Sequence, residues 1–241
     1  MAINFFNQAS FNDVEMQEDL TPSRRLLETD LYRGKIKQVY LDAPNEGGAA
    51  FLNVTINIME DSSGHKIAPA FEYSQRLYVT NREGCPYFVS KTTGKQIMMP
   101  GAQIMNELSL LYLGKALKDL GESDVEERKI KIHNFKADSD ETREVTVYTA
   151  FENLDVAVLI RKVKDFKYQS DDIVENNDII KFVDLQTLAT YSEKEKEQDP
   201  RYVKNYLGVN KGRVYDKTTK SNKQAKDSKP AYPTWDAAFN K

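Results

Sequence analysis

Aromatic and basic side chains are interleaved along several extended segments of this 241-residue chain. Grooves that bind single-stranded nucleic acids combine positive charge, which holds the phosphates, with aromatic rings on which the bases stack. The candidates for stacking are Tyr40, Phe51, Tyr78, Tyr87 and Phe88, with Asn53 on the same strand face as Phe51. The candidates for phosphate contacts are Lys35, Lys37, Arg76, Arg82, Arg161 and Lys162. Tyr and Lys are also ordinary on exposed strands, so the interleaving over several strands, rather than any single residue, supports nucleic-acid binding.

Catalytic and metal-binding patterns are weak. The two histidines, His65 and His133, have no Cys, His or Asp partner at the spacing of metal ligands. Cys85 stands alone, and Thr93-Gly94-Lys95 lacks the upstream glycine of a phosphate-binding loop. We therefore expect no enzyme activity, no metal and no cofactor, although a hydrolase built on two carboxylates that meet only in the folded chain stays open.

The charge of the chain is unevenly distributed. Its 34 Lys and Arg residues oppose 37 Asp and Glu residues, for a net charge of −3. Residues 191–241 hold 12 basic and 7 acidic residues, or +5, which leaves 22 basic and 30 acidic residues, or −8, in residues 1–190. A nucleic-acid site therefore has to be a local positive strip on an acidic body. The same acidic balance favours the alternative of a protein-interaction or structural module.

The cellular compartment is predicted from three features: the cysteine count, the absence of a long apolar run and the composition of the first 20 residues. With one cysteine the chain forms no internal disulfide, which suits a reducing cytoplasm. No run of 18 apolar residues predicts a membrane span, and the first 20 residues lack the basic and apolar regions of a signal peptide. We expect a cytoplasmic protein without a membrane partner.

Period-two hydrophobicity predicts the first half of the fold. Leu52, Val54, Ile56 and Ile58 alternate with polar residues, as in a strand with one buried face. Turn-forming residues separate this strand from its neighbours. The sequence predicts an antiparallel meander with strands at 31–41, 51–59 and 72–80.

The second half mixes hydrophobic periods. Glycines and prolines predict a loop or short hairpin over 84–101, and an apolar period near 3.6 predicts one helix over 102–120, ended by Gly121. Further strands are predicted at 128–135, 143–151, 155–166 and 179–183. The fold class expected is mainly β, an open Greek-key barrel with one inserted helix.

Two appendages flank the predicted domain of residues 30–190. Residues 1–29 show no period and are interpreted as an N-terminal arm. Residues 191–241 are interpreted as a flexible charged tail, because they are polar and lysine-rich. The aromatic tip of this tail, with Tyr232, Trp235 and Phe239, is a candidate docking peptide for a partner protein.

This order of elements resembles an OB-fold. The resemblance rests on the stretches LYRGKIKQVYLD, FLNVTINIMED, QRLYVT and FENLDVAVLIRKVKDFKY. With its N-terminal arm and charged tail, the chain resembles single-stranded DNA-binding proteins of bacteriophage replication over about residues 30–185. The resemblance implies a sequence-tolerant protein that coats single-stranded DNA during replication, recombination and repair, and recruits replication proteins through its C-terminal tip. An RNA-binding OB-fold protein is the nearer alternative. One departure is the basic tail, which has Asp236 as the only acid near its end.

Overall fold

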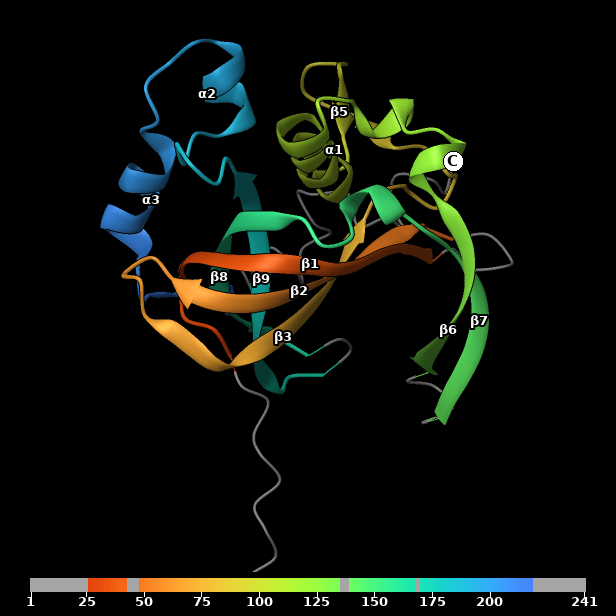
Figure 1. Ribbon diagram of the computed structural model, residues 1–241, viewed down its shortest axis with the longest axis horizontal. Helices are drawn as coiled ribbons and strands as arrows, with labels where there is room; N and C mark the ends of the chain where they lie inside the picture. The colour runs from red at the N-terminus through yellow and green to blue at the C-terminus, as the bar shows by residue number, and fades with distance from the viewer. Residues whose placement is uncertain (1–25, 43–47, 135–138, 168–169, 219–241) are drawn as a thin grey trace, which may run out of the picture.

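One strongly curled β-sheet organises the computed structural model, which describes residues 26–42, 48–134, 139–167 and 170–218 (Figure 1). The protein is mainly β, and its largely antiparallel sheet curls into a half-barrel with a few helices around it. The curled part runs in the order β9–β8–β1–β2–β3. The bounds of these strands are β1 (Asp30–Asp42), β2 (Phe51–Asp61), β3 (Lys66–Tyr78), β8 (Asp155–Phe166) and β9 (Ile173–Val183).

The antiparallel meander β1–β2–β3 is confirmed, although β3 begins earlier than the sequence predicts. Alternation has its expected effect on β2, where Leu52, Val54, Ile56 and Ile58 are at most 1% exposed inside the barrel. Their neighbours point to the outer face, because successive strand side chains take opposite sides. Burying this aliphatic row contributes to the hydrophobic stabilisation of the domain.

The two edges of the half-barrel, β3 and β9, are bridged by side chains. The Oε1 atom of Gln75 accepts a hydrogen bond from the backbone N–H of Ile179 at 2.5 Å. The Tyr73 hydroxyl donates to the Asn177 carbonyl at 3.0 Å. No backbone ladder joins these two edges in the described chain, so a seam is left between them.

Helix α1 (Pro100–Leu113) packs against both edges of this seam. The helix approaches β3 tightly at Gly101, where an added Cβ would lie 2.3 Å from the carbonyl oxygen of Tyr78. The helix is shorter than predicted, because Gly114 ends it in the left-handed conformation at φ 67°. The chain then turns through the short 3-10 helices η2 (Leu117–Asp119) and η3 (Glu122–Asp124).

Two hairpins flank the barrel. The short hairpin of β4 (Tyr87–Val89) and β5 (Gln96–Met98) confirms the hairpin predicted within 84–101. Strands β6 (Glu126–Asn134) and β7 (Ser139–Val147) form a longer hairpin that projects from the sheet (Figure 1). The predicted strand over 143–151 is wrong in its last residues, because the chain turns through η4 (Thr149–Phe151) and buries Phe151 in the core.

The segment from Tyr191 to Thr218 is not the flexible tail that its composition predicts. It contains α2 (Tyr191–Glu195), α3 (Tyr202–Asn210) and β10 (Val214–Asp216), which pairs parallel with β8. Val203 is 6% exposed and packs with Leu31 and Leu159 on the convex side of the sheet. A few apolar contacts to an existing sheet are enough to order a segment whose overall composition is polar.

Some predicted features fall outside the described residues. They are most of the N-terminal arm (residues 1–25) and the whole aromatic tip with Tyr232, Trp235 and Phe239. Of the helices that the structure does describe, none has the length and hydrophobicity needed to cross a membrane.

Candidate nucleic-acid interface

The outer faces of β2 and β3 carry a compact group of predicted binding residues. Phe51 and Tyr78 lie opposite each other in the ladder, with ring centroids 5.6 Å apart in an edge-to-face arrangement. The guanidinium of Arg76 lies 4.9 Å from the centroid of Phe51, within the range of a cation–π contact. Tyr78 is 52% exposed, so this cluster offers both an aromatic surface and a positive charge.

A groove of about 660 Å³ runs beside this cluster, between the outer sheet face, the β6–β7 hairpin and β9. Its walls come from strands far apart in sequence. The lining residues are Tyr40, Asn53, Glu72, Tyr73, Ser74, Gln75, Arg76, Lys131, Ile132, Asn176 and Asn177. Of the sequence-predicted residues, Tyr40, Asn53 and Arg76 therefore meet in one groove.

Asn53 contributes a nearly buried polar side chain to this groove. The residue is 7% exposed, its amide nitrogen Nδ2 is buried, and its side chain interacts with the hydroxyl of Tyr40. Both residues line the groove, so a ligand that entered it would meet these two polar groups together.

Tyr40 forms the junction between the sheet and the β6–β7 hairpin. Its ring packs against the hairpin's apolar cluster of Ile132, Val145 and Val147. Burial raises the pKa of the Tyr40 hydroxyl, and the neighbouring Asp42 raises it further. The hydroxyl is therefore neutral at physiological pH and can act as a hydrogen-bond donor.

A bidentate ion pair sets the position of the hairpin. Arg143 on β7 donates to the two carboxylate oxygens of the buried Asp42 at 2.8 and 3.0 Å. Paired hydrogen bonds of this kind restrict orientation as well as distance. The wall that carries Lys131 and Ile132 is thereby held at a defined angle to the sheet.

A second cavity, of about 400 Å³, lies in the seam between β3, β9 and α1. It shares Gln75 and Arg76 with the groove, so the two hollows adjoin along β3. Tyr78 and Arg161 also line it. Arg161, which is distant in sequence, is thus brought to the same cavity as Arg76 and Tyr78.

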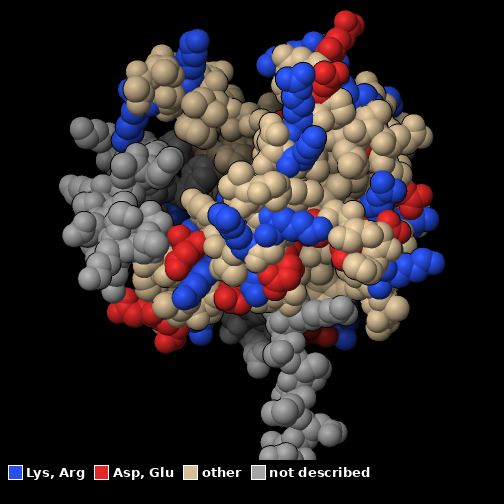
Figure 2. All heavy atoms as spheres, turned by 90° about the vertical axis from the view of Figure 1, so that its left-hand side faces the viewer, with Lys and Arg blue, Asp and Glu red and all other residues tan. Residues whose placement is uncertain are grey.

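Carboxylates accompany several of the predicted phosphate-binding cations. Lys37 donates to Glu72 at 2.5 Å, and the Nζ atom of Lys35 lies 3.6 Å from the carboxylate of Asp155. Basic and acidic side chains are also intermixed on the face that carries α2 and α3 (Figure 2). A phosphate backbone would have to compete with these partners, so charge alone provides a weak attraction.

The remaining predicted residues line neither cavity. Lys162 lies between Glu28 and Glu175 at 3.0 and 3.3 Å, and its hydrogen bond to Glu28 is the main cause of its raised pKa. Arg82 is exposed in the turn after β3. Tyr87 and Phe88 lie on β4, where Phe88 packs partly against the core.

Sequence reasoning missed several residues of these surfaces. Lys131 and Ile132 were predicted in a strand but not in the site, and Asn176 and Asn177 precede the short strand predicted over 179–183. Tyr202 and Tyr206 were missed because their segment was interpreted as a tail. Their i, i+4 spacing, with Val203 and Leu207 between and beyond them, was a helical signal that could have revealed them.

Comparison with known proteins finds no match to a family model, to a curated protein or to a solved structure. The fold and the surfaces described above are therefore the basis for a functional assignment. Among the described residues, no three His, Cys, Asp or Glu side chains lie together in a way that could hold a metal ion.

Proposed function

We propose that this protein binds single-stranded DNA through the groove beside β2 and β3, in a sequence-tolerant manner. The meander, the helix before the later strands and the curled sheet support an OB-fold-like assignment, in which the face of strands two and three binds oligonucleotides. The resemblance to phage single-stranded DNA-binding proteins adds the role of coating exposed strands in replication, recombination or repair. Recruitment of replication proteins through Trp235 and its neighbours is part of the same proposal.

One observation supports this proposal above the others: Arg76, which contacts the Phe51 ring of the Phe51–Tyr78 pair, also lines the groove that holds Tyr40 and Asn53. The ring of Tyr78 offers a stacking surface, and Phe51 and Arg76 support it from the side. Asn53 and Tyr40 both line the groove, where their polar groups are candidates for hydrogen bonds to a base. Stacking is tolerant of sequence because every base has a π-face.

The binding mechanism depends more on stacking than on charge. A strand entering the groove would place a base on Tyr78, an acceptor against Asn53, and phosphates near Arg76 and Lys131. The cations already have acidic neighbours, such as Asp140 beside Lys131 at 2.9 Å. Net phosphate attraction is therefore moderate, which also disfavours binding to duplex DNA and other polyanions on the acidic body of the protein.

A titration with a fluorescent oligothymidine at low salt tests this function. Dissociation constants in the micromolar range or tighter are expected, with weaker competition by duplex DNA. An unlabelled oligouridine competitor decides between DNA and RNA. Absence of binding at low salt would reject the proposal, and self-association in the same sample would instead favour the protein-interaction alternative.

A further inference from the structure

A second aromatic and basic surface lies on the segment that follows the barrel. Tyr202 and Tyr206 on α3 stack on each other, with ring centroids 6.1 Å apart and planes inclined by 20°. Tyr215 on β10 is 49% exposed, and Tyr202 is 36% exposed. We call Tyr202, Tyr206 and Tyr215 the tyrosine patch.

Arg161 connects the tyrosine patch to the seam. Its guanidinium carbon lies 4.3 Å from the ring centroid of Tyr215, and its Nη2 lies 3.3 Å from the carboxylate of Asp178. The residue also lines the seam cavity together with Arg76 and Tyr78. A continuous series of aromatic and basic groups thus runs from the outer face of β3, across the seam, to α3 and β10.

Two further features fit a ligand-binding surface. The Nε atom of Arg161 and the hydroxyl of Tyr206 are both buried without a hydrogen-bond partner. Lys181, whose ammonium pairs with the carboxylate of Glu107 at 2.5 Å, lies 5.9 Å from the ring centroid of Tyr202. Exposed aromatic rings with adjacent cations are the groups that bases and phosphates of a single strand require.

The position of Tyr202 is set by a buried carboxylate. Glu193 accepts hydrogen bonds from the backbone N–H groups of Arg201 and Tyr202 at 2.8 and 2.7 Å. The same side chain forms a capping box with Thr190 at the start of α2. The patch is therefore part of the folded domain, built on α3 as it docks on the sheet.

We propose that the bound single strand continues from the groove across the seam and stacks on the tyrosine patch. This inference rests on the proposed function. It means that the nucleic-acid site covers more nucleotides than the outer face of β2 and β3 could contact alone. Single-strand binding sites of about 4–16 nucleotides for each OB-fold accommodate such an extension. The strand passes Tyr78, then Arg161, then Tyr215 and Tyr202.

Two oligothymidines, one of about 6 and one of about 15 nucleotides, separate this extension from the primary site. In the double variant Tyr202→Ala/Tyr215→Ala, we expect the longer oligonucleotide to bind at least about fivefold more weakly than in the wild type. Binding of the shorter oligonucleotide should stay within about twofold. Because longer strands also offer more registers, wild type and variant are compared on the same oligonucleotide.

Two control proteins accompany this measurement. Tyr202→Phe/Tyr215→Phe keeps the rings and should bind both oligonucleotides as the wild type does. Lys204→Ala removes an exposed cation from α3, outside the patch, and should have an effect below about twofold. Melting curves confirm that each variant is folded.

The outcomes are distinguishable. Unchanged binding of the longer oligonucleotide by the Ala double variant would overturn the extension, and so would an equal loss for both lengths or a loss in the Phe variant. If the wild type binds neither oligonucleotide, the proposed function itself fails. If the wild type binds the shorter oligonucleotide and the Ala double variant binds the longer one as tightly as the wild type does, only the extension fails.

Discussion

Truncation of Tyr78 to alanine separates stacking from folding most directly. The ring is 52% exposed and its ordered aromatic contact is the edge-to-face pair with Phe51. Losing that pair costs about 0.5–1.5 kcal/mol of folding free energy, a small part of the roughly 5–15 kcal/mol typical of a domain. Tyr78→Ala should therefore remain folded, with a modestly lower melting temperature.

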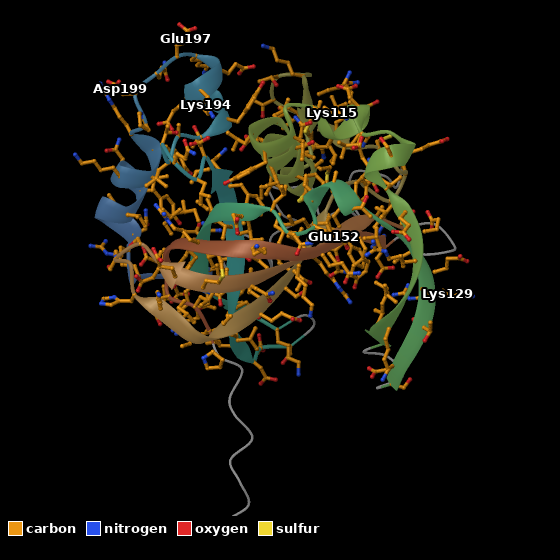
Figure 3. The ribbon with its side chains drawn as sticks, viewed as in Figure 1. Lys115, Lys129, Glu152, Lys194, Glu197 and Asp199 are labelled. Atoms are coloured by element: carbon orange, nitrogen blue, oxygen red, sulfur yellow. The ribbon has the colours of Figure 1, made fainter. Side chains whose placement is uncertain are left out.

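The effect on DNA binding should be larger. A stacked base is worth about 1–3 kcal/mol when the ring is truncated, which corresponds to an affinity loss of about 5- to 150-fold. Fluorescence anisotropy with labelled oligothymidine measures this loss. Tyr191→Ala provides a matched control on α2. Figure 3 shows Lys194 of this helix at the upper left and Lys129 of the β6–β7 hairpin at the right.

The salt dependence of DNA affinity is a second measurement that tests the role of Tyr78. The Tyr78 ring holds no phosphate, so Tyr78→Ala should leave the slope of log affinity against log salt unchanged. Arg76→Gln should reduce that slope by about 0.7 if Arg76 holds one phosphate of a single strand. Affinity of Tyr78→Ala within about twofold of the wild type would refute the assignment of the stacking face.

Three further changes test other parts of the structure. Asn53→Val should weaken DNA binding, because it removes the amide from the wall of the groove; an unchanged dissociation constant in a titration would contradict this. Glu72→Gln frees Lys37 from its carboxylate partner, so affinity measured at low salt should rise and its salt slope should steepen; an unchanged affinity would show that Lys37 does not approach the phosphates. Burial pushes the pKa of Glu193 up, but hydrogen bonds from backbone N–H groups lower it more, so that it lies below its usual range. The stability from this carboxylate is present above the ordinary glutamate pKa of about 4.3 and is lost as the pH falls through the lowered value. Glu193→Gln should thus lower the melting temperature at pH 7, with a smaller difference near pH 3, and a difference independent of pH would contradict the assignment.

Local patterns predicted a large part of the sheet. Alternation of Leu52, Val54 and Ile56 with polar residues identified β2, because side-chain direction in a strand has a period of two and only one face is buried. The predicted strand over 155–166 coincides with β8. The helix was predicted in place but too long, since Gly114 ended it before the apolar pattern did.

The arrangement of the candidate site was less accessible from the sequence. Phe51 and Tyr78 were selected on adjacent strands, and antiparallel pairing places them together. Lys162 was selected because basic and aromatic residues are interleaved along its strand, yet it lies between two carboxylates and lines neither cavity. Composition shows which cations exist, whereas the carboxylates that compensate them come from distant segments.

The sequence by itself determined the β class, the meander and the polar face of β2, because these depend on contacts between near neighbours in the chain. Only the tertiary structure decided that the β6–β7 hairpin forms a wall of the groove and that Arg161 meets Tyr78 at the seam. It also decided that the polar segment with α3 folds onto the sheet. These features depend on how strongly the sheet curls and on which strands become its edges, and residues more than 80 positions apart, such as Tyr78 and Arg161, set that geometry jointly.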